Sequence, residues 1–214
     1  MRRRLLIATL VLLAAGGPAR GLAGPSGDPV DPWQALAQLR LHLAASGALV
    51  GDFVQTFVPA GFASGEEESG RVALAIPDCL RWDYLTPYRK SYLLCGPWLH
   101  SWVEGEPRGQ RVHVDLREQN GLDLLLLPVG ELIRRYRASA RTERGEIVVE
   151  LEPTDAARAL ERVTIAFDPA SQRPTALAYG DREGNATRFR FLGFRSIEDP
   201  DLFSPPGELE WTEP

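Results

Sequence analysis

The sequence is poor in the residues on which common catalytic and metal sites depend. Its 214 residues include two cysteines, three histidines and one methionine. It contains no Gly-x-Ser-x-Gly nucleophile motif, no His-Glu-x-x-His zinc motif and no glycine-rich nucleotide-binding loop. These absences argue against a hydrolase, a zinc protease and a nucleotide-dependent enzyme. We therefore predict a protein that is not an enzyme and that uses no cofactor.

The histidines leave one metal-site alternative. If the turn over residues 104–109 is symmetric, His100 and His113 face each other on neighbouring strands. Such a pair binds zinc when a third ligand completes the site. The sequence places no third ligand beside them, so no metal site is predicted.

Long apolar runs are also scarce, apart from one near the start of the chain. Residues 5–15 form an apolar run behind three arginines at positions 2–4, and small residues follow it. This pattern is typical of a signal peptide, which we place at residues 1–23. The run is shorter than the roughly 20 residues that cross a bilayer, and no cysteine near it offers a site for a lipid anchor. We expect residues 24–214 to form one exported domain.

Positive charge is in deficit. The formal net charge is -5, and removing residues 1–23, with four arginines and no acids, changes it to -9. This acidic balance argues against nucleic acid as a partner and against electrostatic docking on an anionic membrane. A hydrophobic content of 44% is too high for a disordered chain.

The first regular element predicted is a helix. Asp31 can cap its start, Pro32 suits its first position, and Gly47 ends it. Apolar residues at helical spacing give this helix one face to bury. They are Trp33, Leu36, Leu39 and Leu43.

Beyond Gly47 the apolar period changes to two, which predicts ten or eleven short strands in an antiparallel barrel or strongly curled sheet. The alternation is interrupted at residues 122–136, a leucine-rich stretch that favours one or two short helices. This stretch is either a core helix that plugs one end of the sheet or a mobile lid over a cavity. We also expect one helical turn within residues 153–160 and an extended, proline-rich end from residue 203.

Residues 79–95 predict a β-hairpin. If Pro87 lies at the centre of its turn, Cys79 faces Cys95 and Arg81 faces Leu93. Directly opposed residues on antiparallel strands are close enough for a disulfide, and export favours oxidation. We predict this disulfide, with a contribution of roughly 2–3 kcal/mol to stability. A register shifted by one residue would instead leave two buried thiols.

The opposite face of this hairpin is apolar, and Arg81 interrupts the apolar sequence. One interpretation is that Arg81 lies at a rim, with its charge in water. The other is an inward arginine that donates to backbone carbonyls of a covering segment and controls the opening of a cavity. The apolar face carries Leu80, Trp82, Tyr84, Tyr92 and Leu94.

Several short stretches together resemble one family. They are Phe-Val-Gln-Thr-Phe at 53–57, Leu-Arg-Trp-Asp-Tyr at 80–84 after Pro77, Phe-Asp-Pro at 167–169 and Leu-Phe-Ser-Pro-Pro-Gly at 202–207. In their order and spacing they are similar to the LolA-type periplasmic lipoprotein carriers. The resemblance implies an unclosed antiparallel β-barrel with an N-terminal helix and a short helical lid. It also implies an apolar cavity for the acyl chains of lipoproteins.

The resemblance further implies partners. Such carriers take lipoproteins from an inner-membrane ABC-type extractor and deliver them to an outer-membrane acceptor across the periplasm. We expect a monomer. Related carriers of the same fold bind glycolipids or sense lipoproteins, and both alternatives stay open. A groove for a protein partner also fits, because stripes of aromatic residues suit either a lipid or a peptide.

Site residues follow from the same resemblance. Arg81 matches the arginine that ties the lid to the barrel in that family, and Trp82 matches its neighbouring aromatic residue. Together with the apolar hairpin face, the predicted lipid cavity and lid comprise Phe53, Phe57, Leu80, Trp82, Tyr84, Tyr92, Leu94, Leu124 and Leu127.

Overall fold

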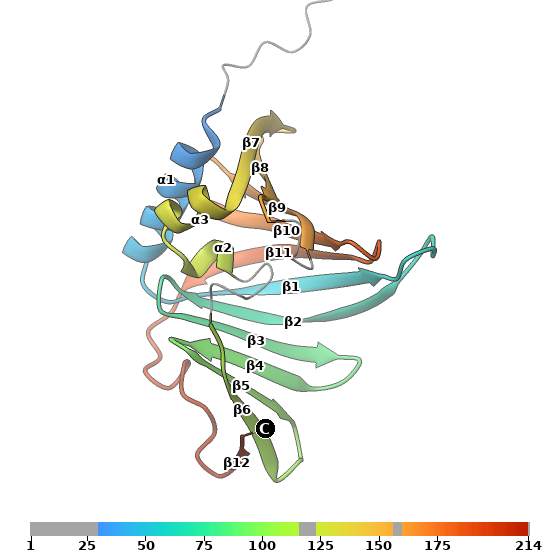
Figure 1. The fold of residues 1–214 in the computed structure, drawn as a ribbon. Coiled ribbons are helices and arrows are strands. Elements are labelled where there is room, and N and C mark those ends of the chain that lie inside the picture. Colours follow the sequence, from blue (N-terminus) through green and yellow to red (C-terminus); the bar gives the residue numbers. More distant parts are fainter. Residues whose placement is uncertain (1–29, 116–122, 156–159, 214) are drawn as a thin grey trace, which may run out of the picture.

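A computed structural model describes residues 30–115, 123–155 and 160–213 of the protein. It is dominated by one curved sheet, with short helices at one side (Figure 1). The helices are α1 (Pro32–Ala45), α2 (Asp123–Leu126) and α3 (Val129–Arg135). The first six strands are β1 (Leu49–Val58), β2 (Glu66–Ala75), β3 (Cys79–Thr86), β4 (Lys90–Cys95), β5 (Trp98–Val103) and β6 (Arg108–His113). The others are β7 (Tyr136–Glu143), β8 (Glu146–Pro153), β9 (Leu160–Asp168), β10 (Arg173–Asp181), β11 (Ala186–Ser196) and β12 (Glu210–Thr212).

The sheet has 12 strands in the order β12-β6-β5-β4-β3-β2-β1-β11-β10-β9-β8-β7 and does not close into a barrel. Two antiparallel meanders, β1 to β6 and β7 to β11, are joined where β1 pairs with β11. The mainly β, unclosed fold predicted from the sequence is confirmed.

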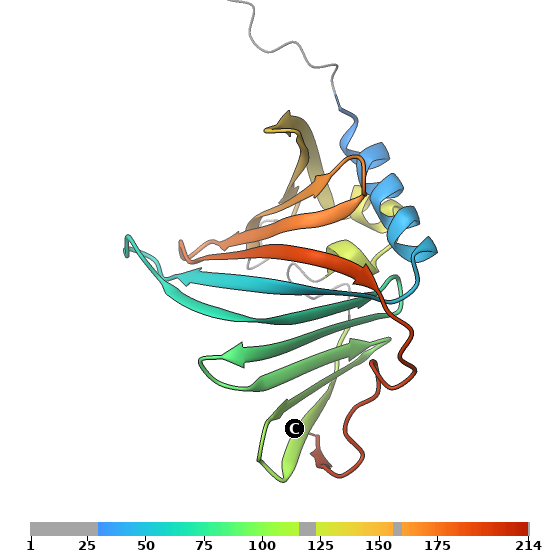
Figure 2. The same ribbon diagram turned by 180° about the vertical axis from the view of Figure 1, so that it is seen from behind.

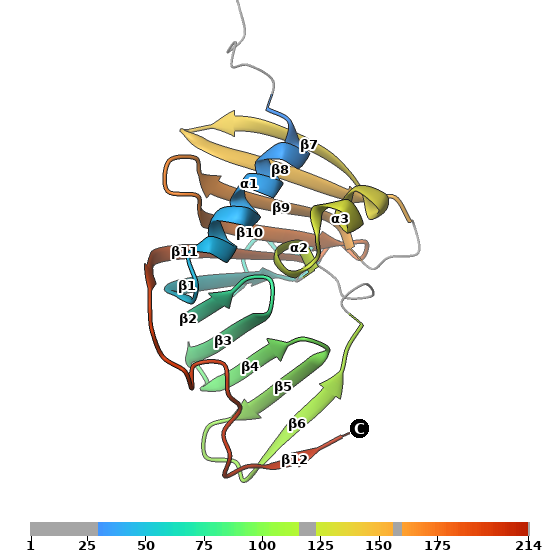
Figure 3. The ribbon, with the colours of Figure 1, turned by 90° about the vertical axis from the view of Figure 1, so that its left-hand side faces the viewer.

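Helix α1 forms where the sequence predicts it. The Asp31 carboxylate accepts hydrogen bonds from the backbone N–H groups of Trp33 (2.8 Å) and Gln34 (3.1 Å), which satisfies two free donors of the first turn. Leu36, Leu39 and Leu43 of this helix are buried in the main apolar core. Figure 3 shows that the three helices lie against one face of the sheet, which we call the inner face.

The opposite face, called the outer face, carries the segment that follows β11. Residues 197–209, the C-terminal segment, run from the end of β11 to the edge strand β6, where β12 pairs in parallel (Figure 2). At Gly109 of β6, an added Cβ would lie 2.4 Å from the Trp211 ring. Glycine at this position therefore leaves room for the indole to pack against the strand.

The register of the hairpin over β3 and β4 matches the prediction. Cys79 pairs with Cys95, and Arg81 pairs with Leu93. The two cysteines form a disulfide with a Cα–Cα separation of 4.3 Å. The prediction of a Cys79–Cys95 disulfide is confirmed, and the alternative of two free thiols is wrong.

Three other expectations need correction or lie outside the described residues. The sheet has one strand more than the ten or eleven predicted, because the three-residue strand β12 lies in a proline-rich stretch with no alternation of its own. The helical turn predicted within residues 153–160 is not tested in full, since β8 extends to Pro153, β9 begins at Leu160 and residues 156–159 lie outside the described part. The signal peptide at residues 1–23 also lies outside it.

The histidine pair is not formed. Strand β6 begins at Arg108, earlier than expected, so the turn before it is shorter and the register shifts by two residues. His100 therefore pairs with Arg111, and His113 pairs with Trp98. Within the described ranges, no group of three or more His, Cys, Asp or Glu side chains is placed to hold a metal ion. The helices described there include none long and apolar enough to cross a membrane.

Candidate functional site

The inner face of the central strands is lined by packed aromatic rings. The ring of Phe53 on β1 makes edge contacts with Trp82 and Tyr84 on β3, with centroids 5.1 and 5.0 Å apart. Trp82 also contacts Phe189 of β11 at 4.8 Å. Gly70 on β2 lies opposite Phe53, and a Cβ there would come within 1.9 Å of the Asp83 carbonyl oxygen. This glycine therefore allows the close approach of β2 to β3 beneath the rings.

A cavity of about 220 Å³ opens on this aromatic layer, and we call it the apolar cavity. It lies between the β3–β5 strands and the β10–β11 strands. The residues that line it are Leu80, Trp82, Tyr84, Tyr92, Leu94, Leu99, Leu177, Tyr179 and Phe189. The structure thus brings together all five residues of the apolar hairpin face, with Phe53 packed against them.

Four lining residues were missed by the sequence reasoning, namely Leu99, Leu177, Tyr179 and Phe189. Their signal was present in the alternation of β5, β10 and β11, but alternation does not reveal that β10 and β11 face β3 and β4 across one cavity. Phe57, predicted for the cavity, lies beyond it on the same face of β1 and is 37% exposed.

One edge of the apolar cavity is polar. The Tyr84 hydroxyl donates to Gln55 Oε1 at 2.5 Å, and the Lys90 ammonium lies 4.6 Å from the centre of the Tyr84 ring. Lys90 also pairs with Glu68 at 2.7 Å. Burial, together with the nearby Glu68 charge, raises the pKa of Tyr84 well above its ordinary value. The phenol is therefore a neutral hydrogen-bond donor at all physiological pH values.

The leucine-rich stretch is built into the apolar core. Leu124, Leu125, Leu126 and Leu127 are all less than 10% exposed and belong to the same buried cluster as Phe53 and Trp82. The predicted residues Leu124 and Leu127 therefore lie in the core beside the aromatic layer. They are not among the residues that line the apolar cavity.

Arg40 of α1 holds this stretch in place. Its guanidinium donates to the carbonyl oxygens of Leu124 (3.4 Å), Leu125 and Leu126 (3.3 Å). A one-turn helix such as α2 leaves its carbonyls without intrahelical partners, so these charge-assisted bonds satisfy groups that would otherwise be unpaired. Burial lowers the pKa of Arg40 from its ordinary value. Sequence reasoning missed this residue, although it lies at helical spacing from Leu36 and Leu43.

Arg81 lies on the other side of the sheet from the helices, so the expected role as the arginine that ties down the lid needs correction. Its Nη1 donates to the Leu202 carbonyl oxygen at 2.8 Å, its Nε pairs with Asp83 at 2.9 Å, and it lies 5.4 Å from the Trp102 ring. Strand alternation explains this position, because Leu80 and Trp82 point inward and residue 81 must point outward. Arg81 does donate to a covering segment, but that segment is residues 197–209.

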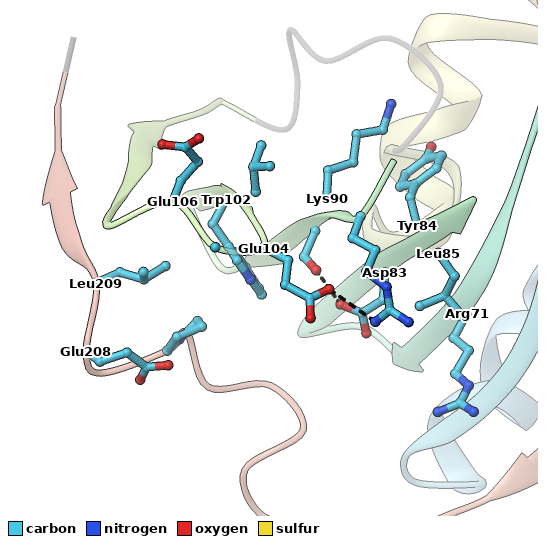
Figure 4. Close-up of a pocket in the computed structure, with 15 residues that line it drawn as sticks. Arg71, Asp83, Tyr84, Leu85, Lys90, Trp102, Glu104, Glu106, Glu208 and Leu209 are labelled. Carbon is cyan, nitrogen blue, oxygen red and sulfur yellow. Dashed lines mark hydrogen bonds and ion pairs between the residues drawn. The ribbon is translucent and has the colours of Figure 1, made fainter. Parts of the chain in front are cut away.

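A larger hollow, of about 330 Å³, lies at the edge of the outer face, between the C-terminal segment and the ends of the central strands (Figure 4). Its walls carry Arg71, Asp83 and the ion pair between Arg89 and Glu104 (3.1 Å). Glu208 and Leu209 close its far side. A hydrocarbon chain would strip water from these charged groups without replacing it, which is costly. The smaller apolar cavity is therefore the better candidate for an apolar ligand.

Comparisons with known proteins give the family of this chain and agree with its fold. The family model described as "Outer membrane lipoprotein carrier protein LolA" matches residues 45–205. The chain belongs to the LolA family. It is 30% identical over 142 residues to an outer-membrane lipoprotein carrier protein of Chromobacterium violaceum, and the match covers 64% of this chain and 63% of that relative.

One solved structure shares the fold at low sequence identity. An uncharacterised conserved protein from Thermus thermophilus aligns with a TM-score of 0.54 at 12% identity, over 86% of this chain and 100% of that one. A LolA superfamily protein from Nitrosomonas europaea aligns with a TM-score of 0.46 at 10% identity, over 84% and 100% of the two chains.

Proposed function

We propose that this protein is a periplasmic carrier that shields the acyl chains of lipoproteins and moves them from the inner to the outer membrane. The observation that carries the proposal is the apolar cavity, lined by leucine and aromatic side chains from five strands. An acyl chain gains about 0.8 kcal/mol for each methylene that it buries. A carrier without such a surface could not take these chains through water.

Loading requires the cavity to grow. Its volume of about 220 Å³ is below the roughly 300–1,000 Å³ of ordinary ligand pockets, and a lipid anchor has more than one acyl chain. The leucines of α2 occupy the neighbouring core space. Moving them out would cost roughly 1.5–3 kcal/mol for each exposed side chain, but an incoming acyl chain offers the same hydrocarbon contacts. We infer that acyl chains replace Leu124 and Leu127, and that Arg40 is the latch that such a movement must release.

The other parts of the proposal concern how the protein reaches the periplasm and which proteins load and unload it. We propose that residues 1–23 direct export and that an inner-membrane ABC-type extractor loads the carrier. An outer-membrane acceptor then receives the cargo from a monomeric carrier. The Cys79–Cys95 disulfide supports an oxidising compartment such as the periplasm.

A binding experiment on residues 24–214 tests the proposal. We expect protein purified from its host to carry acylated ligand in native mass spectrometry, and delipidated protein to take up a fluorescent fatty-acyl probe. Leu99→Asn, in the cavity wall, should weaken probe binding about tenfold, because it exchanges an apolar contact for an unpaired amide. Leu192→Asn is the matched control, since Leu192 is 49% exposed on the outer face.

Three results would count against the proposal. An empty protein that takes up no probe would remove its main support, and equal effects of the two substitutions would place the probe elsewhere. Copurification of a glycolipid in place of an acylated protein would favour the alternative carrier of the same fold.

A further inference from the structure

The inner face of strands β4, β5 and β6 changes from apolar to polar along the strands. The register places Leu94, Leu99 and Val112 side by side in one row. The next row in the same direction contains Tyr92, Ser101 and Gln110, and the one after it contains Lys90, Val103 and Arg108. The face is thus graded from hydrocarbon to charge within three successive rows.

A second hollow lies over the polar end of this gradient, and we call it the polar hollow. It has a volume of about 300 Å³ and is lined by residues that include Lys90, Tyr92, Ser101, Arg108 and Gln110. Tyr92 lines both this hollow and the apolar cavity, so the two spaces adjoin on one face. Figure 4 shows that the side chains of Lys90 and Tyr84 extend in the direction opposite to that of Arg71, although both residues also line the larger hollow at the edge of the outer face.

The charges of the polar hollow are already paired by the protein itself. Lys90 contacts Glu68 at 2.7 Å, with both side chains less than 30% exposed, and Arg108 contacts Glu210 at 3.0 Å. Glu106 adds a further carboxylate to the lining. An anionic head group would therefore meet more carboxylates than cations there. A neutral ester or amide would find hydrogen-bond donors in the Lys90 ammonium, the Ser101 hydroxyl and the Gln110 amide.

We infer that the polar hollow binds the neutral, carbonyl-bearing head group of the acyl cargo whose chains occupy the apolar cavity, and that it selects against anionic lipids. This inference rests on the proposed function and adds a choice of head group to it. Selection by head group would distinguish the cargo from free fatty acids and anionic phospholipids, because these offer the same acyl chains. The Lys90–Glu68 pair supplies the discrimination, since Glu68 prevents Lys90 from pairing with a ligand anion.

Competition between two ligands with the same acyl chain tests this inference. Monopalmitoylglycerol and palmitate are each used to displace a fluorescent acyl probe from residues 24–214 at pH 8, where palmitate is charged. We expect wild-type protein to bind the ester about tenfold more tightly than the acid, because the acid brings its charge beside Glu68. Glu68→Gln frees Lys90 and should remove this preference by strengthening palmitate binding. Glu67→Gln, one position along on the opposite face, should keep the wild-type preference.

The possible outcomes separate this inference from the proposed function. Equal wild-type affinities for the ester and the acid, or equal effects of Glu68→Gln and Glu67→Gln, would overturn the head-group assignment and leave the acyl carrier standing. If neither monopalmitoylglycerol nor palmitate displaces the bound probe, or if the probe itself does not bind, both the head-group assignment and the proposed acyl carrier would be overturned.

Discussion

The two faces of strand β3 are covered in different ways. On the inner face, Trp82 contacts aromatic rings and lines a cavity beside a stretch of leucines that apolar contacts and the Arg40 bonds hold. On the outer face, Arg81 holds the C-terminal segment through a hydrogen bond to the Leu202 carbonyl, while an ion pair with Asp83 of the same strand orients its guanidinium, beside a disulfide.

The difference concerns which contacts a ligand can replace. Leucine contacts are non-directional, so an acyl chain can substitute for them at little net cost in free energy. A disulfide and a bonded arginine are specific in geometry, and no hydrocarbon replaces them. We therefore expect substitutions on the outer face to lower stability, and substitutions on the inner face to change binding.

The largest expected effect is on the outer face. Replacing both Cys79 and Cys95 by serine should lower the free energy of unfolding by about 3 kcal/mol, because the disulfide closes a short loop. Affinity for an acyl probe at 25 °C should stay unchanged, since both sulfur atoms lie away from the apolar cavity. Urea unfolding and probe titration of the same samples measure the two quantities. Loss of affinity with unchanged stability would contradict the comparison.

Arg81→Leu tests the same face without touching the disulfide. It removes the hydrogen bond to the Leu202 carbonyl and the bond to Asp83, which keeps its hydrogen bond from the Ser91 hydroxyl, and we expect a loss of about 1–2 kcal/mol in unfolding free energy. The rate at which an acyl probe dissociates should not change. A faster release with little change in stability would instead restore Arg81 as the arginine that controls the lid.

Arg40→Leu tests the inner face. Loss of its bonds to the α2 carbonyls should ease the movement of the leucines by about 1 kcal/mol, which corresponds to roughly fivefold faster probe release. Stopped-flow displacement of the bound probe measures this rate. Gln38→Leu, at an exposed position of the same helix, serves as the control and should release the probe at the wild-type rate.

The smallest expected effect is a pH dependence on the outer face. Burial and the Arg111 charge lower the pKa of His100, whose ring contacts Trp211 at 5.0 Å. Because its folded-state pKa is depressed below the unfolded value of about 6.5, the unfolded chain binds more protons. Its stability contribution is therefore present above about pH 6.5 and is lost as pH falls through the folded pKa. His100→Phe should make the free energy of unfolding vary less with pH between pH 8 and pH 5. An unchanged pH dependence would mean that other groups cause it.

The parts of the fold that depend on local pattern could be predicted. The alternation around Trp82 defined the apolar face, and the position of Pro87 gave the register that pairs Cys79 with Cys95. Features set by distant segments could not. The family resemblance assigned both Arg81 and Trp82 to the lid and cavity, although neighbours on a strand face opposite sides. Arg40 could have been found, since it interrupts an apolar helix face, but its acceptors lie 84 to 86 residues away.

The parallel strand β12 has a consequence for the order in which the molecule is completed. Its residue Glu210 pairs with Arg108 of β6 across 102 positions, so this edge of the sheet stays bare until long after the central strands can form. Bare strand edges pair readily with other chains. While the chain folds, the interval between the two strands is thus a period of vulnerability to aggregation, and it ends when the Trp211 indole packs against Gly109.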